Sequence, residues 1–164
     1  MQDQPVILLC ATLLLVAPAY SQQAPKLTVS GDLPSPLQLT AADLAAMPRQ
    51  TVTVKDEHGQ TNQYEGVLLH EILKRAGAPV EKDLRGNALA SYVLAKATDG
   101  YQVVFTLAEL ESNFANEAIL ITDKRDGKPL PDGQGPFRIV CPNDRGGGRS
   151  VRMLDSLLFV KLLK

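Results

Sequence analysis

Alternating polar and apolar positions predict β-strands along much of the chain. Residues 50–56, QTVTVKD, alternate and are rich in Thr and Val, and residues 61–66, TNQYEG, return as a second strand after a turn. Residues 91–110, SYVLAKATDGYQVVFTLAEL, contain two strands around Asp99-Gly100, a strong hairpin signal. Shorter apolar runs predict further strands in KLTVSG, EAILITD, FRIVCP and SLLFVKLL. The chain is therefore expected to contain roughly eight strands.

Helical spacing is confined to short segments. In residues 67–79, VLLHEILKRAGAP, the apolar residues that share one helical face are Leu68, Leu69, Ile72, Leu73 and Ala76. Thr40 with Asp43 three residues later predicts the start of a second helix, which Pro48 ends. Thr106 is expected to cap a short helix toward Leu110. The pattern predicts an α+β fold with a mostly antiparallel or mixed sheet and a few short helices.

The N-terminal segment has the pattern of a secretory signal. Residues 6–17 are apolar and are followed by Ala19-Tyr20-Ser21, a small-x-small cleavage pattern, so we expect a signal peptide over residues 1–21. An uncleaved membrane anchor is the alternative. Cleavage predicts a periplasmic or secreted protein without stable membrane insertion. We expect an extended lead-in over residues 22–36 and one domain over residues 37–164.

Charge changes the picture locally, not globally. The net charge of −1 and the absence of Trp argue against a nucleic-acid partner. Between Asp123 and Arg152, however, seven Lys or Arg and four Asp residues give a net charge of +3. One interpretation is a solvated surface. The other is an anion site, in which the backbone N–H groups of Gly146, Gly147 and Gly148 converge on an oxyanion and Arg149 and Arg152 add bidentate contacts.

Side chains suited to acid–base or metal chemistry are few. Signal cleavage would leave Cys141, which is expected to be a buried small hydrophobe, with a reactive thiolate among nearby arginines as the alternative. His58 is expected in a surface turn, and His70 has no second His at helical spacing, so no zinc site is predicted. An enzyme with this sequence would depend on a bound cofactor for its chemistry.

Three segments in this order resemble the oxidoreductase molybdopterin-binding domain family, which has the sulfite oxidase-like fold. They are YEGVLLHEILKRAGA, ATDGYQVVFTLAEL and the long block AILITDKRDGKPLPDGQGPFRIVCPNDRGGGRSVRMLDSLLFV. The resemblance covers roughly residues 37–162 and implies a molybdopterin cofactor. It also implies that the segment after the glycine loop contacts the pterin and its phosphate, through Arg149, Ser150 and Arg152, with Arg138 as a further candidate.

The chain departs from the family pattern at the metal ligand. The family's cysteine follows an early strand, and this chain has Lys55 and Asp56 there; Gln134 stands where the family has a histidine. Two functions therefore remain open. One is a molybdopterin-dependent oxidoreductase that takes a small anionic substrate or an electron-transfer partner. The other is a non-catalytic periplasmic module that binds an anion or a partner protein. A purely structural domain with a solvated arginine rim is the third reading.

Overall fold

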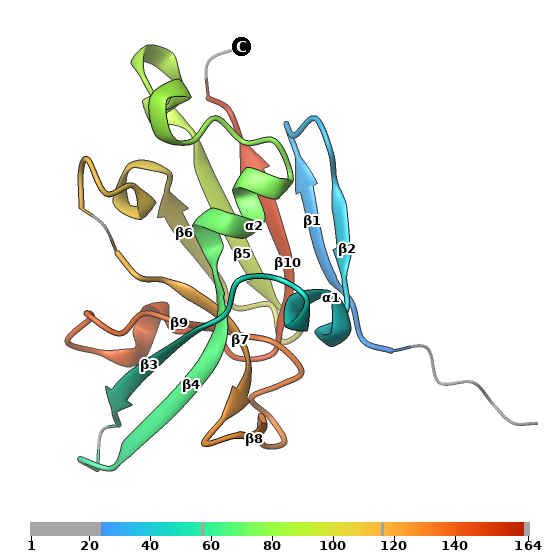
Figure 1. The fold of residues 1–164 in the computed structure, drawn as a ribbon, viewed down its shortest axis with the longest axis vertical. Helices are drawn as coiled ribbons and strands as arrows, with labels where there is room; N and C mark the ends of the chain where they lie inside the picture. Colours follow the sequence, from blue (N-terminus) through green and yellow to red (C-terminus); the bar gives the residue numbers. More distant parts are fainter. Residues whose placement is uncertain (1–23, 57, 116, 163–164) are drawn as a thin grey trace, which may run out of the picture.

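The computed structural model describes residues 24–56, 58–115 and 117–162. The predicted signal peptide over residues 1–21 lies outside the described residues. The described part of the chain forms two five-stranded sheets with a few short helices (Figure 1), in agreement with the predicted α+β class.

Sheet A has the strand order β2-β1-β10-β5-β6. Its strands are β1 (Leu27–Gly31), β2 (Leu37–Leu39), β5 (Tyr92–Ala97), β6 (Gln102–Thr106) and β10 (Leu154–Val160). β1 runs parallel to β10, and the other neighbours are antiparallel. The β5–β6 hairpin predicted around Asp99-Gly100 is confirmed. Residues 27–31 of the expected extended lead-in form β1, which lies inside this sheet.

Sheet B is organised around β7. It consists of β3 (Gln50–Lys55), β4 (Thr61–Leu68), β7 (Leu120–Arg125), β8 (Lys128–Pro129) and β9 (Arg138–Val140). β7 pairs antiparallel with β4, β8 and β9. The two strands predicted by the alternation in residues 50–56 and 61–66 are confirmed as the β3–β4 pair.

A β-bulge in β7 changes which side chains share a face. Gly66 of β4 lies opposite Thr122 of β7, but the next pair along the strands joins residue 65 to residue 124, so Asp123 has no partner in the register. The extra residue shifts the alternation by one position, so residues after the bulge that would otherwise face one side of the sheet face the other side. Tyr64 pairs with Arg125 and Thr122 pairs with Arg138, and all four side chains therefore lie on one face of sheet B.

Short helices occupy the connections. α1 (Ala41–Ala45) begins with the predicted capping box, in which Thr40 and Asp43 exchange hydrogen bonds. α2 (Leu69–Arg75) begins later than the pattern of residues 67–79 suggested, because residues 67 and 68 continue β4 and pair with β7. The 3₁₀ turns are η1 (Glu81–Asp83), η2 (Gly86–Ala90), η3 (Ala108–Leu110) and η4 (Gly147–Arg149).

One hydrophobic core joins both sheets and α2. Its largest fully buried side chains include Phe105 of β6, Phe137 just before β9 and Phe159 of β10. Burial of these rings supplies much of the apolar area that holds the sheets together. Within the described residues, no helix has the length and apolar character needed to cross a membrane.

The close approach of β4 to β7 gives a first testable prediction. A Cβ at Gly66 would lie 2.2 Å from the carbonyl oxygen of Ile121, a backbone atom that cannot move without disturbing the bulge. We expect Gly66→Ala to lower the free energy of unfolding by about 2 kcal/mol or more. Gly146→Ala is the control, since that glycine has a φ of −137° and nothing within 4 Å of its Cβ position. Urea unfolding monitored by circular dichroism measures both, and equal effects would contradict the argument.

Candidate functional site

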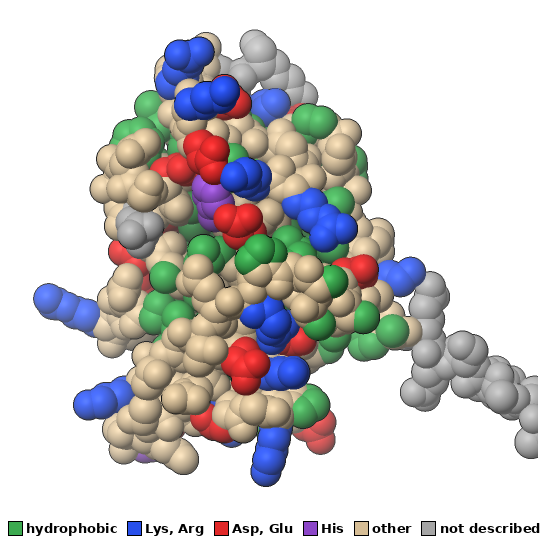
Figure 2. All heavy atoms as spheres, viewed as in Figure 1, with side chains coloured by type: hydrophobic (Ala, Val, Ile, Leu, Met, Phe, Trp, Pro, Cys, Tyr) green, Lys and Arg blue, Asp and Glu red, His purple; other side chains and the backbone are tan. Residues whose placement is uncertain are grey.

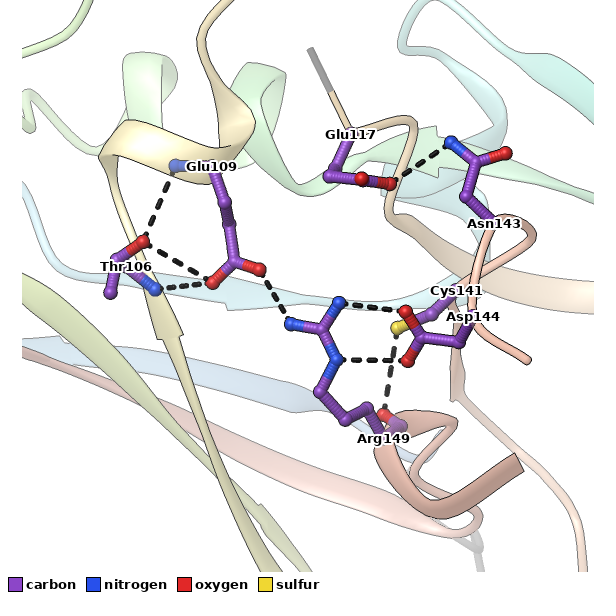
Figure 3. Close-up of polar contacts among 7 residues, drawn as sticks. All are labelled: Thr106, Glu109, Glu117, Cys141, Asn143, Asp144 and Arg149. Atoms are coloured by element: carbon purple, nitrogen blue, oxygen red, sulfur yellow. Dashed lines mark hydrogen bonds and ion pairs between the residues drawn. The ribbon is translucent and has the colours of Figure 1, made fainter. Parts of the chain in front are cut away.

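Arg149, a predicted cofactor ligand, is held by two carboxylates (Figure 3). Its Nε and Nη2 each donate to Asp144 at 2.8 Å, and its Nη1 donates to Glu109 Oε2 at 2.5 Å. The guanidinium also lies 5.4 Å from the centroid of the Phe105 ring. The hydrogen bonds to Asp144 and then to Glu109 raise the pKa of Arg149 above its ordinary value. An incoming phosphate would have to displace these carboxylates to reach the guanidinium.

The three consecutive glycines form part of the turn that carries Arg149. Gly147 and Gly148 lie in η4, and the carbonyl oxygen of Gly148 accepts a hydrogen bond of 2.7 Å from the Tyr101 hydroxyl. No heavy atom lies within 4 Å of a Cβ at Gly146 or Gly147. The surrounding space therefore does not demand glycine at these two positions, and their predicted role in binding an anion stays a prediction.

Ser150 and Cys141 contact each other beneath this turn. The Ser150 hydroxyl accepts a hydrogen bond of 3.2 Å from the backbone N–H of Cys141, and the Cys141 thiol lies 3.7 Å from the carbonyl oxygen of Arg149. Burial, followed by the negative charge of Asp144, raises the pKa of the Cys141 thiol to about 12. Cys141 is thus the buried small hydrophobe that was expected, and it is protonated at neutral pH.

Arg138, by contrast, has neutral partners. Its Nη1 donates to the Tyr64 hydroxyl at 3.0 Å and to Gln134 Oε1 at 2.5 Å, and its guanidinium lies 5.0 Å from the centroid of the Tyr64 ring. Its Nε is buried without a hydrogen-bond partner. Within the described part of the chain, no carboxylate forms an ion pair with Arg138. A half-buried cation without a counter-ion is costly, so the arrangement favours an added anion.

Arg152 adds positive charge beside Arg138, and so does Arg125, although Arg125 also forms an ion pair of 3.7 Å with Asp126. Burial first, and then the charges of Arg152 and Arg125, lower the pKa of Arg138 below its ordinary value. Arg152 is exposed, and Arg125 lies on the same sheet face as Arg138 because of the bulge at Asp123. We call Arg125, Arg138 and Arg152 the arginine face. The sequence analysis counted all three of these charges but did not identify Tyr64 as a contact of Arg138. The only sequence signal for Tyr64 was its position in a predicted strand.

The bulge that builds this face is itself fixed by an ion pair. The buried carboxylate of Asp123 accepts a hydrogen bond of 2.6 Å from Arg49 Nη2, and Arg49 directly precedes β3. A second donor of the same guanidinium, Nη1, is buried without a partner. The pair thus links the bulged residue of β7 to the edge strand of sheet B.

The position where the family would place its cysteine lies in a hairpin turn. Asp56 follows β3, is exposed, and its Oδ1 accepts backbone hydrogen bonds from Gln60 at 2.8 Å and His58 at 3.0 Å. The hydrogen bond from Gln60 is the main cause of the lowered pKa of Asp56. In the described residues no group of three or more His, Cys, Asp or Glu could hold a metal ion. The arginine face therefore suits the anionic part of a molybdopterin, whereas the described residues offer its metal no thiolate.

Comparison with known proteins places the chain among molybdopterin domains. Residues 15–162 match the family model described as the oxidoreductase molybdopterin binding domain. A search of curated proteins gave no match. Among solved structures, the chain is similar to the crystal structure of the sulfane dehydrogenase SoxCD from Paracoccus pantotrophus, with a TM-score of 0.65 and 19% sequence identity. The alignment covers 84% of this chain and only 38% of that chain. With a TM-score of 0.65, the likeness confirms the predicted fold.

The carboxylate clamp on Arg149 predicts a stability effect that depends on pH. We expect Arg149→Met to lower the free energy of unfolding by about 1–2 kcal/mol at pH 7, because two half-buried carboxylates lose their cation. Arg149 holds the pKa of Asp144 below its usual value of 3.8 in the folded state. The part of the effect that comes from Asp144 is therefore complete well above pH 3.8 and is lost as the pH falls through the depressed folded-state pKa of Asp144.

Urea unfolding at pH 7 and at pH 2 measures this effect. Arg145→Met, at an exposed position of the same loop, is the charge-matched control and should change the free energy of unfolding by no more than about 0.5 kcal/mol. A difference between the Arg149 variant and the unchanged protein that is as large at pH 2 as at pH 7 would contradict the assignment.

The state of Cys141 predicts low thiol reactivity. With a pKa of about 12, Cys141 should react with iodoacetamide at pH 8 about a thousandfold more slowly than an ordinary thiol. Mass-spectrometric mapping of the Cys141 peptide gives the rate, and the same peptide in urea-unfolded protein is the control. Rapid labelling in the folded protein would show an exposed thiolate and reopen Cys141 as a ligand.

Proposed function

The chain belongs to the oxidoreductase molybdopterin-binding domain family, and on this premise we propose that the arginine face binds the phosphorylated part of a pterin cofactor. The observation that carries the proposal is the Nε of Arg138, which is buried without a partner in a guanidinium that has no carboxylate beside it. Guanidinium groups bind phosphate through paired N–H donors, and burial strengthens such contacts.

Each residue of the site has a distinct part in this proposal. Tyr64 and Gln134 orient Arg138 by accepting hydrogen bonds from its Nη1, which leaves Nε and Nη2 without a partner among the described residues. Arg152 is exposed and adds charge at the rim. Arg149 acts by positioning the turn that leads to Ser150 and Arg152, since both of its edges already contact carboxylates.

We place a binding module first and a redox enzyme second. A molybdenum centre, when bound, would supply two-electron or oxygen-atom transfer. The candidate metal ligands of the described residues favour cofactor binding without a protein thiolate. Asp56 accepts the hydrogen bonds of a turn, and Cys141 is buried and protonated. Family membership favours the second candidate, a molybdopterin-dependent oxidoreductase that acts on a small anionic substrate or with an electron-transfer partner. The apolar N-terminal segment supports a periplasmic or secreted location for either.

Loss of the central arginine is the direct test. We expect Arg138→Gln to reduce the pterin retained by the purified full chain about tenfold or more, because a charge-assisted contact to phosphate is lost. The protein is produced in a host that makes the cofactor, and pterin is measured by fluorescence after denaturation. Arg145→Gln removes the same charge from an exposed position and should retain pterin normally.

Two further measurements keep the test decisive. Arg152→Gln changes an exposed side chain, so it preserves the fold even where Arg138→Gln does not, and it should reduce pterin by a smaller factor. Equal pterin in the unchanged, Arg138 and Arg152 proteins would overturn the proposed site. Near-stoichiometric molybdenum by elemental analysis, together with sulfite-dependent reduction of ferricyanide, would establish the second candidate over the first.

A further inference from the structure

Two neutral side chains fix the orientation of Arg138. Figure 2 shows basic and acidic side chains mixed over sheet B, so contacts rather than local charge identify an arginine that is open to an anion. The Nη1 of Arg138 donates to the Tyr64 hydroxyl at 3.0 Å and to Gln134 Oε1 at 2.5 Å. A phenol and a carboxamide accept these bonds without negative charge, so the guanidinium keeps its net charge for a ligand.

The backbone holds Gln134 in its place beside Arg138. Gln134 lies in the turn before β9, and its N–H donates to the carbonyl oxygen of Pro131 at 3.0 Å. Its own carbonyl oxygen accepts a hydrogen bond of 3.0 Å from the N–H of Met153, the residue that follows Arg152. This bond joins the two segments that carry Arg138 and Arg152, so the position of Gln134 is set by the fold and not by the side-chain contact alone.

Arg149 shows what a charged partner does to an arginine in this domain. Its Nε and Nη2 donate to the two oxygens of Asp144, each at 2.8 Å. On Arg138 the same two nitrogens have no hydrogen-bond partner among the described residues, and Nε is buried. Two oxygens of an oxyanion can bind this edge of Arg138 in the way that Asp144 binds Arg149.

The charges around Arg138 come mainly from other arginines. Arg152 and Arg125 act on it through their charge, and Arg125 lies 3.7 Å from Asp126. Further charged residues lie on the neighbouring strands and turns, and within the described residues none of them forms a hydrogen bond or an ion pair with Arg138: Glu65, Asp123, Lys124, Lys128 and Asp132.

Histidine is the side chain whose charge ordinarily changes between about pH 5 and 8. The sequence contains His58 and His70, which lie in the turn between β3 and β4 and in α2. Neither forms a hydrogen bond with Arg138. The contribution of the described residues to anion binding at Arg138 is therefore expected to stay constant over this pH range.

We propose that Gln134 determines the anion specificity of the arginine face, because it orients Arg138 without neutralising it and without adding a group that titrates between about pH 5 and 8. A dianion then binds the Nε and Nη2 of Arg138 with an affinity that does not change over this range. The inference rests on the proposed function, in which the bound anion is the phosphate of a pterin. A carboxylate at position 134 would occupy Arg138 itself, and an imidazole there would make binding depend on pH.

Sulfate is the probe, because it stays a dianion at pH 5.5 and pH 8, whereas a phosphate monoester changes its charge near about pH 6. Sodium sulfate is titrated into the full chain at constant ionic strength. NMR follows the Nε–H signal of Arg138, which is identified by its loss in Arg138→Gln. The unchanged protein should bind sulfate with the same affinity at both pH values, within about twofold. A larger change would contradict the inference.

Gln134→Glu is the first variant. Its carboxylate keeps an acceptor for Arg138 Nη1 but neutralises the guanidinium, so the affinity for sulfate should fall about tenfold or more. The urea midpoint of unfolding should not fall, because the contact to Arg138 is kept. Gln102→Glu makes the same change at an exposed position of β6 and should bind sulfate normally. Equal affinity in the Gln134→Glu and unchanged proteins would overturn the inference.

Gln134→His adds a measurement that a purely structural role would not affect, and it decides the question where Gln134→Glu does not fold. Protonation of the imidazole places a positive charge beside the bound anion. The affinity for sulfate should therefore be about fivefold or more higher at pH 5.5 than at pH 8. A flat or reversed pH profile would show that position 134 does not control the anion site.

Pterin retention separates a failure of this inference from a failure of the proposed function. Suppose that Arg138→Gln loses both pterin and sulfate, while both Gln134 variants behave like the unchanged protein. The arginine face then binds anions, and only the role of Gln134 is wrong. Pterin retained through Arg138 without saturable sulfate binding would also refute the inference alone. Unchanged pterin and sulfate binding in Arg138→Gln would overturn the site and the inference together.

Discussion

The bulge at Asp123 is the constraint on which the candidate cofactor site depends. Without the extra residue, Arg125 would lie on the opposite face of sheet B from Thr122 and Arg138. The bulge is held from two directions, by the Arg49 ion pair to Asp123 and by the close approach of Gly66 to β7. Because β7 also pairs with β8 and β9, one local irregularity positions side chains on four strands.

The fold was predictable wherever the signal was local. The alternation in residues 50–56, the capping box at Thr40 and the Asp99-Gly100 turn each specify their element within a few residues, and each is confirmed. The late start of α2 was not predictable, because β4 extends through Leu68 only where β7 is present to pair with it. The parallel pairing of β1 with β10 likewise joins the first and last strands of the described residues and leaves no local trace.

The site was less predictable, because charge counting does not reveal partners. Arg149 and Arg138 looked alike in the sequence, yet Arg149 reaches Glu109, forty residues earlier, while Arg138 reaches the neutral Tyr64. Of these two described arginines, Arg138 alone has a buried donor without a hydrogen-bond partner. A cleft lined by His70, Glu111 and Glu117 was missed for the same reason, because these residues are separated in sequence and meet only through tertiary packing.

β7 links the arginine face to a cleft at the other end of the sheet. The strand begins at Leu120, directly after Ile119 of the cleft lined by His70, Glu111 and Glu117, and it ends at Arg125 on the arginine face, about 17 Å further along by the rise of a strand. That distance exceeds the Debye length at physiological salt, so the acidic groups of the cleft do little to the anion preference of the arginine face. Residue roles in this domain follow from partners in space rather than from position in a motif.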